Sequence, residues 1–130
     1  MTMGPSPEPA VEYLRAADRA LEEARVLLER ELIGGAANRA YYAMFYAVHA
    51  ALSKADVRRP KTHAGAINTF GAQYVQTGKI ERDYAKDLQD ARELRQKSDY
   101  ELYGAGEDDV TEMVRKAEAF VARVRREVTG

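Results

Sequence analysis

The segment from Asn38 to Leu52 constrains the fold of this chain more than any other. Its fifteen residues include three plainly polar ones, Asn38, Arg39 and His49, and contain neither Gly nor Pro. A run of this length and apolarity exceeds what most strands show, and it lacks the residues that mark turns. It therefore predicts a central, nearly buried helix.

The polar side chains within this segment are not scattered. Asn38, Tyr42, Tyr46 and His49 follow one another at spacings of 4, 4 and 3 residues, which places them on one face of a helix. A buried polar group without a partner costs roughly 1–3 kcal/mol. The stripe is therefore expected to face protein partners, water or a ligand, whereas Tyr41 is interpreted as a packing residue.

Composition limits the classes of function. The chain has 130 residues, no cysteine, two histidines and a formal net charge of −1. Disulfides and thiolate metal sites are excluded, a dedicated transition-metal site is not expected, and no cofactor is predicted. The charge argues against non-specific coating of nucleic acid but allows a local basic site for RNA. Without a membrane span or a signal peptide, the expected location is the cytoplasm, with no membrane association.

The remaining sequence predicts further helices and no convincing strand. Residues 1–8 are predicted to form a disordered Pro-rich lead-in, and residues 9–130 a single domain. Apolar periodicity gives a first helix ending near Gly34-Gly35, the second helix extending to about Lys54, and a fourth from about Ile80 to Lys97. The expected fold is an all-α, up-and-down bundle of about five helices with the second helix at its centre.

Local signals mark the limits of the other two helices. Thr62 is a plausible N-cap for the third helix, and Gly78 suits the left-handed residue beyond its end. Asp109 with Glu112 resembles a capping box that opens the last helix.

Charged residues on the fourth helix form the first candidate site. Helical geometry places Arg92, Arg95 and Asp99 at the edge of the apolar face, unlike Arg82, and Tyr100 adds a hydroxyl next to them. A guanidinium in such a position needs a carboxylate, a carbonyl or a phosphate as its partner. Both a structural Arg–Asp pair and a ligand-binding group remain open.

The sequence Lys61-Thr62-His63 forms the second candidate site, at the start of a helix. Backbone N–H groups and the helix dipole favour an anion there, so His63 could contact phosphate or RNA and transfer protons. The alternative is a surface histidine next to a helix cap, and the sequence alone favours this alternative.

Several uncommon strings occur together in one order. They are A-x-N-R-A-Y-Y-A-M-F-Y-A at residues 36–47, K-T-H at 61–63, F-G-x-x-Y-V-x-T-G at 70–78 and R-E-L-R-Q-K-S-D-Y at 92–100. Over about residues 10 to 126 the chain resembles the HEPN domain superfamily, in particular its small single-domain prokaryotic branch (UPF0332-like). The resemblance implies a HEPN-like four-helix bundle plus one helix, paired as a homodimer with a cleft between the protomers.

The resemblance also implies a set of functions. Many HEPN proteins are metal-independent ribonucleases, with an Arg and, after four to six residues, a His on one helix; others pair with a minimal nucleotidyltransferase in toxin–antitoxin modules. Here Tyr100 stands at the fifth position after Arg95, and no His follows Arg92 or Arg95. His63 could replace the missing histidine only if the fold brings its helix start to that cleft.

The first hypothesis is a HEPN-domain protein that binds RNA or nucleotide as half of a HEPN/minimal-nucleotidyltransferase pair. The alternatives are a metal-independent ribonuclease toxin, with Arg95 and Tyr100 as catalytic residues or His63 in place of Tyr100, and a non-catalytic helical interaction module. The expected ligand- or RNA-binding residues are Asn38, Arg39, Tyr42, Lys61, His63, Arg92 and Asp99.

Overall fold

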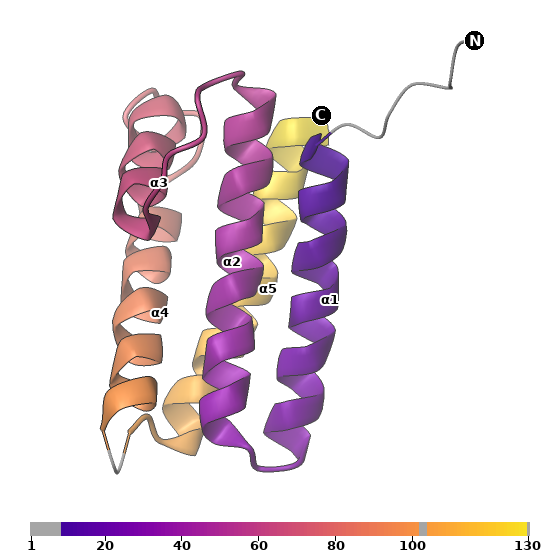
Figure 1. Cartoon of the computed structure of the whole chain (residues 1–130), viewed down its shortest axis with the longest axis vertical. Helices are drawn as coiled ribbons and strands as arrows, with labels where there is room; N and C mark the ends of the chain where they lie inside the picture. The colour runs from indigo at the N-terminus through magenta and orange to yellow at the C-terminus, as the bar shows by residue number, and fades with distance from the viewer. Residues whose placement is uncertain (1–8, 102–103, 130) are drawn as a thin grey trace, which may run out of the picture.

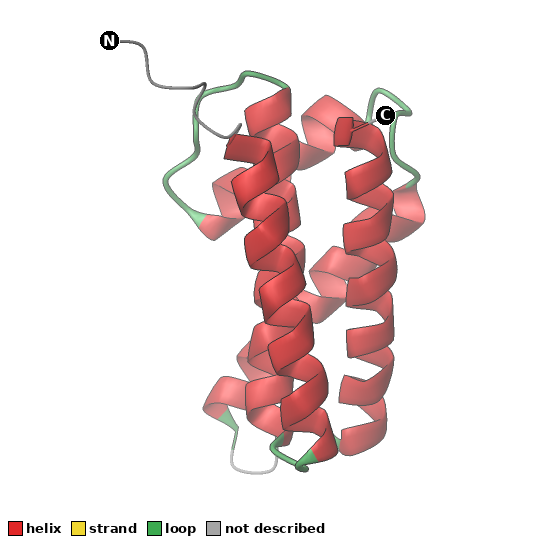
Figure 2. Cartoon of the chain, turned by 90° about the vertical axis from the view of Figure 1, so that its right-hand side faces the viewer, coloured by secondary structure: helices red, strands yellow, loops and turns green. Residues whose placement is uncertain are grey.

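The chain folds into a bundle of helices, as the computed structural model of residues 9–101 and 104–129 shows (Figure 1). Within these residues every regular element is a helix, and loops connect them (Figure 2). The elements are α1 (Pro9–Glu29), α2 (Ile33–Lys54), α3 (His63–Phe70), the π-helix η1 (Gly71–Val75), α4 (Arg82–Tyr100) and α5 (Glu107–Thr129). The predicted all-α bundle is confirmed. The predicted lead-in, residues 1–8, lies outside the described residues.

Helix α2 occupies the centre of the bundle. It contacts α1, α3, α4 and α5, and α1 packs along most of its length (Figure 1). Thirteen of its 22 residues are buried, and many are alanines that allow neighbouring helices to approach closely. The central, nearly buried helix predicted from residues 38–52 is therefore confirmed.

The predicted end of the first helix is wrong. Gly34 and Gly35 lie inside the first turn of α2, and α1 ends at Glu29. The left-handed position belongs to Glu31, with φ of 59°. Backbone bonds from Leu32 N to Leu27 O (2.8 Å) and from Glu31 N to Leu28 O (3.0 Å) close the helix end.

Gly34 and Gly35 instead allow α4 and α1 to pack closely against the start of α2. A Cβ atom at Gly35 would lie 3.2 Å from Leu27 Cδ1 on α1, and one at Gly34 would lie 3.3 Å from Ser98 Oγ on α4. Both distances are shorter than an ordinary van der Waals contact, so these positions favour a residue without a side chain.

The predicted capping box of the last helix is also wrong. Helix α5 begins at Glu107, two residues before Asp109, and Glu112 pairs with Arg115 one turn further along the helix. Three acidic residues in the first turn, Glu107, Asp108 and Asp109, instead complement the positive end of the helix dipole.

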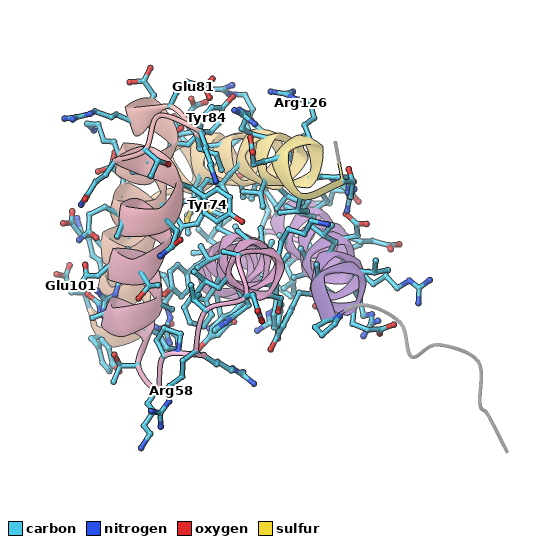
Figure 3. The ribbon with its side chains drawn as sticks, turned by 90° about the horizontal axis from the view of Figure 1, so that it is seen from above. Arg58, Tyr74, Glu81, Tyr84, Glu101 and Arg126 are labelled. Carbon is cyan, nitrogen blue, oxygen red and sulfur yellow. The ribbon has the colours of Figure 1, made fainter. Side chains whose placement is uncertain are left out.

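The signals for the third helix are confirmed. The Thr62 hydroxyl accepts a hydrogen bond from Gly65 N at 2.9 Å, and Gly78 has φ of +80°. Between them the helix widens into η1, where the Tyr74 hydroxyl donates to Ala51 O on α2 at 2.6 Å. Tyr74 lies in the space enclosed by the helices (Figure 3). This bond ties the segment after α3 to the central helix.

The loop between α2 and α3 determines where α3 begins. After Lys54 the chain turns back and descends along the side of the bundle, so that α3 starts next to the middle of α2 (Figures 1 and 2). His63, the first residue of α3, is thereby placed against α2. No helix in the described part of the chain is long and apolar enough to cross a membrane.

Candidate functional site

His63 packs into an aromatic cluster on α2. Its ring is stacked on Phe45, with centroids 4.1 Å apart, and its Nδ1 lies 2.9 Å from the Tyr41 hydroxyl in a hydrogen bond. The Tyr42 ring contacts the His63 ring edge-on, with centroids 5.8 Å apart. The sequence alone favoured a surface histidine next to a helix cap. The cap at Thr62 is present, but His63 is half-buried, and the rings of Tyr41, Tyr42 and Phe45 fix its orientation.

The electrostatic environment keeps both His63 and Tyr41 uncharged. Burial, together with the positive charges of Arg95 and Arg92, lowers the pKa of His63 below its usual range. Burial raises the pKa of Tyr41 to about 12, against the opposing effect of the same two arginines. At neutral pH the site thus holds a neutral imidazole and a protonated phenol, and the imidazole can accept a proton.

Arg95 projects from α4 over the same tyrosines. The carbon of its guanidinium lies 5.5 Å from the Tyr41 ring centroid and 5.4 Å from that of Tyr42. Both distances are within the range of a cation–π interaction. The side chain is 20 % exposed, which confirms its predicted position at the edge of the core.

The carboxylate partner of Arg95 leaves part of the guanidinium unsatisfied. Arg95 Nε is 3.0 Å from Asp99 Oδ2 one turn along the helix, but the contact lacks hydrogen-bond geometry. Nε is sealed from solvent and has no hydrogen-bond partner among the described residues. The Arg–Asp pair predicted as the structural alternative is present, and it leaves Nε without a hydrogen bond.

Arg92 adds a second positive charge to the site. It is half-buried on α4, one turn before Arg95, whereas Arg82 on the same helix is exposed. No carboxylate in the described ranges forms an ion pair with Arg92. Its positive charge contributes to lowering the pKa of His63 and opposes the rise in the pKa of Tyr41.

Asn38 and Arg39 flank the cluster at the start of the polar stripe. Arg39 donates two hydrogen bonds to Asn38 Oδ1, at 3.1 and 3.0 Å, and its guanidinium carbon lies 5.2 Å from the Tyr42 ring centroid. Tyr42 is therefore close to two guanidinium groups, those of Arg39 and Arg95. The side-chain carbonyl of Asn38 already accepts hydrogen bonds from Arg39.

Tyr100 differs from the expectation of an inward-facing hydroxyl. Its side chain is 83 % exposed at the last residue of α4. The structure therefore brings together His63, Arg92, Arg95, Asp99 and Tyr42 in one chain, and leaves the phenol of Tyr100 in solvent.

The loop before α3 forms one wall of a pocket next to His63. The pocket has a volume of about 420 Å³ and is lined by Phe45, His49, Arg59, Pro60, Lys61, Thr62 and His63. Lys61 is exposed at its rim. His49, the last member of the predicted stripe, is 5 % exposed and is stacked on Tyr13 with centroids 5.3 Å apart.

Sequence reasoning missed Tyr41 and Phe45 as parts of this site. Both read as packing residues, and both are buried, but their rings and the Tyr41 hydroxyl position His63. No local signal indicated this, because 22 residues separate Tyr41 from His63. In the described residues no group of His, Asp and Glu side chains is arranged to hold a metal ion.

The fold and the site together define a class: an all-α domain whose central aromatic helix supports an Arg–His cluster from two other helices. The sequence profile of the HEPN domain matches residues 10–127, and the chain belongs to the HEPN domain family.

Named relatives agree with this membership. The chain is 36 % identical over 121 residues to a UPF0332 protein of Thermotoga maritima, covering 92 % of this chain and 91 % of the relative. It is 34 % identical over 113 residues to a Methanocaldococcus jannaschii protein named "Putative toxin MJ0605", covering 87 % and 84 %. A second protein of that organism, "Putative toxin MJ0142", is 29 % identical over 106 residues, covering 82 % and 66 %.

Proposed function

We propose that this chain is a toxin-like HEPN-domain protein that binds the phosphates of RNA or a nucleotide at Arg92, Arg95 and His63. A homodimer with a minimal nucleotidyltransferase as its partner is the expected assembly, in the cytoplasm. The toxin names of two relatives support the role, and the cluster of charges supports the ligand.

One observation is central to the proposal: Arg95 and His63, from different helices, meet at the ring of Tyr41. Nε of the Arg95 guanidinium is sealed from solvent, but its two outer nitrogens are not, and they form no hydrogen bond with another described residue, so they can donate to a ligand. Phosphate is a preferred partner of such a group because it accepts several charge-assisted hydrogen bonds. Arg92 forms no ion pair with a carboxylate in the described ranges and adds a second positive charge.

The test of binding is a titration of fluorescently labelled single-stranded RNA in EDTA, followed by anisotropy. Arg95→Ala should weaken binding by about ten- to a hundredfold, because hydrogen bonds to charged groups contribute about 1.5–3 kcal/mol. Arg82→Ala is the matched control, since Arg82 is an exposed arginine on the same helix. Equal effects of the two changes, with unchanged circular-dichroism melts, would contradict the proposed site.

The partner is tested separately. The proposal requires a minimal nucleotidyltransferase gene next to that of this chain, and co-expression of the two proteins, followed by size-exclusion chromatography, should give one complex. Expression of the chain alone should slow growth, and Arg95→Ala should relieve the effect. Normal growth with the wild-type chain and separate elution of the two proteins would remove the toxin–antitoxin assignment.

A second candidate function is a metal-independent ribonuclease. The specific observation in its favour is that His63, neutral at neutral pH, lies near Arg92 and Arg95, although it comes from α3 and not from the helix that carries these arginines. His63 would take the proton of a ribose 2′-hydroxyl, and the 2′-oxygen would attack the adjacent phosphorus and displace the 5′-oxygen, leaving a 2′,3′-cyclic phosphate. Arg95 would stabilise charge on the phosphate, and the protonated His63 would return the proton to the departing 5′-oxygen.

The two functions are separated by incubating the same RNA with the protein in EDTA. Under the nuclease hypothesis the RNA is cleaved, and both His63→Gln and Arg95→Ala abolish cleavage. Binding without cleavage favours the first function. Cleavage that survives His63→Gln would exclude His63 as the proton carrier.

A further inference from the structure

The pocket at the start of α3 adjoins the Arg95 cluster without being part of it. His63 belongs to both, because it lines the pocket and also bonds Tyr41 beneath Arg95. His63 therefore links the Arg95 cluster to a cavity of about 420 Å³.

Two cations line this pocket. Neither Arg59 nor Lys61 forms an ion pair with a carboxylate in the part of the chain that the structure describes. The Arg59 guanidinium is held near the face of Tyr13, with its carbon 5.8 Å from the ring centroid. Backbone N–H groups at the start of α3 add partial positive charge to the same wall. The pocket is therefore suited to an anion.

A buried side chain without a hydrogen-bond partner provides a second, independent indication of a ligand. His49 is 5 % exposed and lines the pocket, and its ring is fixed by Tyr13 and by an edge-on contact with Phe45 at 4.6 Å. No hydrogen bond between described residues involves either of its ring nitrogens, and neither nitrogen is sealed from solvent. Burial, with the charges of Arg59 and His63, lowers its pKa, so the ring is neutral at neutral pH. A neutral imidazole offers one donor and one acceptor, which match a sugar hydroxyl or a base edge.

We infer that this pocket binds the nucleotide next to the one whose phosphate lies on Arg95, so that the ligand is a single strand of RNA spanning both sites. Arg59 and Lys61 bind the second phosphate, and His49 hydrogen-bonds to the sugar or the base. The inference rests on the proposed function and deepens it, because it selects a strand with consecutive phosphates over a mononucleotide.

The salt dependence of RNA binding tests the second phosphate. For single strands, the logarithm of the binding constant falls with the logarithm of salt concentration by about 0.7 for each neutralised phosphate. Removing the contacts in the double variant Arg59→Gln/Lys61→Gln should lower affinity and reduce that slope by about 0.7. Arg58→Gln is the control, because Arg58 is exposed on the same loop, is not part of the pocket lining and points away from the bundle (Figure 3).

Ligand length provides the second measurement. The wild-type protein should bind a dinucleotide with two phosphates more tightly than adenosine 5′-monophosphate, and the double variant should bind the two equally. His49→Phe, which keeps an aromatic ring and removes both nitrogens, should weaken dinucleotide binding and leave the monophosphate unaffected. Circular-dichroism melts verify that each variant is folded.

The outcomes distinguish failure of this inference from failure of the proposed function. If RNA binding depends on Arg95, but the double variant matches Arg58→Gln in affinity and salt slope, the pocket inference is wrong and the proposed function stands. Equal wild-type affinity for the mono- and dinucleotide also overturns the inference. If the wild-type protein binds no RNA, both are wrong.

Discussion

Tyr41 and His49 show how single residues of the central helix serve both the core and the site. Tyr41 is fully buried, yet its hydroxyl orients the His63 ring, and Arg95 lies over its aromatic face. His49 is nearly as buried and places its imidazole against a pocket lined by cations. Such residues combine packing with chemistry because an aromatic side chain has an apolar body and a polar tip.

The stability of the domain should depend on pH through His49. Its pKa is lowered in the folded state by burial and by Arg59 and His63, the charged and titratable groups that affect it, while an unfolded histidine titrates near about 6.5. As the pH falls below about 6.5, His49 binds more protons in the unfolded chain than in the folded one. The free energy of unfolding should therefore fall as pH decreases. The contribution of His49 is at most about 1.4 kcal/mol per pH unit.

Urea unfolding at several pH values between about 7.5 and 5.5 measures this dependence. His49→Phe should make the dependence shallower, because Phe does not titrate. An unchanged pH profile in this variant would show that His49 is protonated equally in both states.

At the scale of elements, the start of α3 is the structural feature on which the site depends most. Thr62 caps the helix, and the next residue, His63, reaches the Tyr41 hydroxyl. Behind it, the π-helix and the Tyr74–Ala51 hydrogen bond attach the same segment to α2. The short α3 is thus held at both ends.

Thr62→Ala should reduce the free energy of unfolding by about 0.5–2 kcal/mol, because Gly65 N loses its side-chain acceptor. It should also weaken RNA binding, since the cap orients His63. Thr62→Ser, which keeps the hydroxyl, should restore both properties.

Thr111→Ala on α5 is a suitable control for the cap, since the Thr111 hydroxyl donates to Glu107 O within a helix. Urea unfolding should show little change there, because Ala is the better helix former. A Thr62→Ala variant as stable as Thr111→Ala would mean that the cap contributes nothing.

For the molecule as a whole, stability depends on the close approach of α1, α4 and α5 to α2. Most of the buried residues that α1 and α2 contribute to the core are alanines, and Ala17, Ala24, Ala40, Ala43 and Ala47 have no exposed surface. The site lies on the side of α2 that faces α3 and α4, so its geometry depends on the same packing.

Ala47→Leu should destabilise the domain by about 1–3 kcal/mol, because three further carbon atoms must be accommodated at a fully buried position. The same substitution at Ala119, which is exposed on α5, should change stability by less than about 0.5 kcal/mol. Thermal unfolding followed by circular dichroism compares the two. Similar melting temperatures would indicate that the core has room at Ala47.

Local interactions made much of this molecule predictable. The apolar length of residues 38–52, the Thr62 cap, the left-handed Gly78 and the position of Arg92 and Arg95 at the edge of the core all follow from periodicity and backbone chemistry, and the structure confirms them. These features depend on residues within a few positions of each other.

The site itself was decided by tertiary structure. His63 meets Tyr41 only because the loop after α2 turns back along the bundle, and Arg95 reaches the same ring from a third helix. The roles of Gly34 and Gly35 likewise depend on how closely α1 and α4 approach α2. Sequence periodicity assigns a residue to a face of its own helix, but it does not specify which residue of another helix lies opposite, because that depends on the packing of the whole bundle.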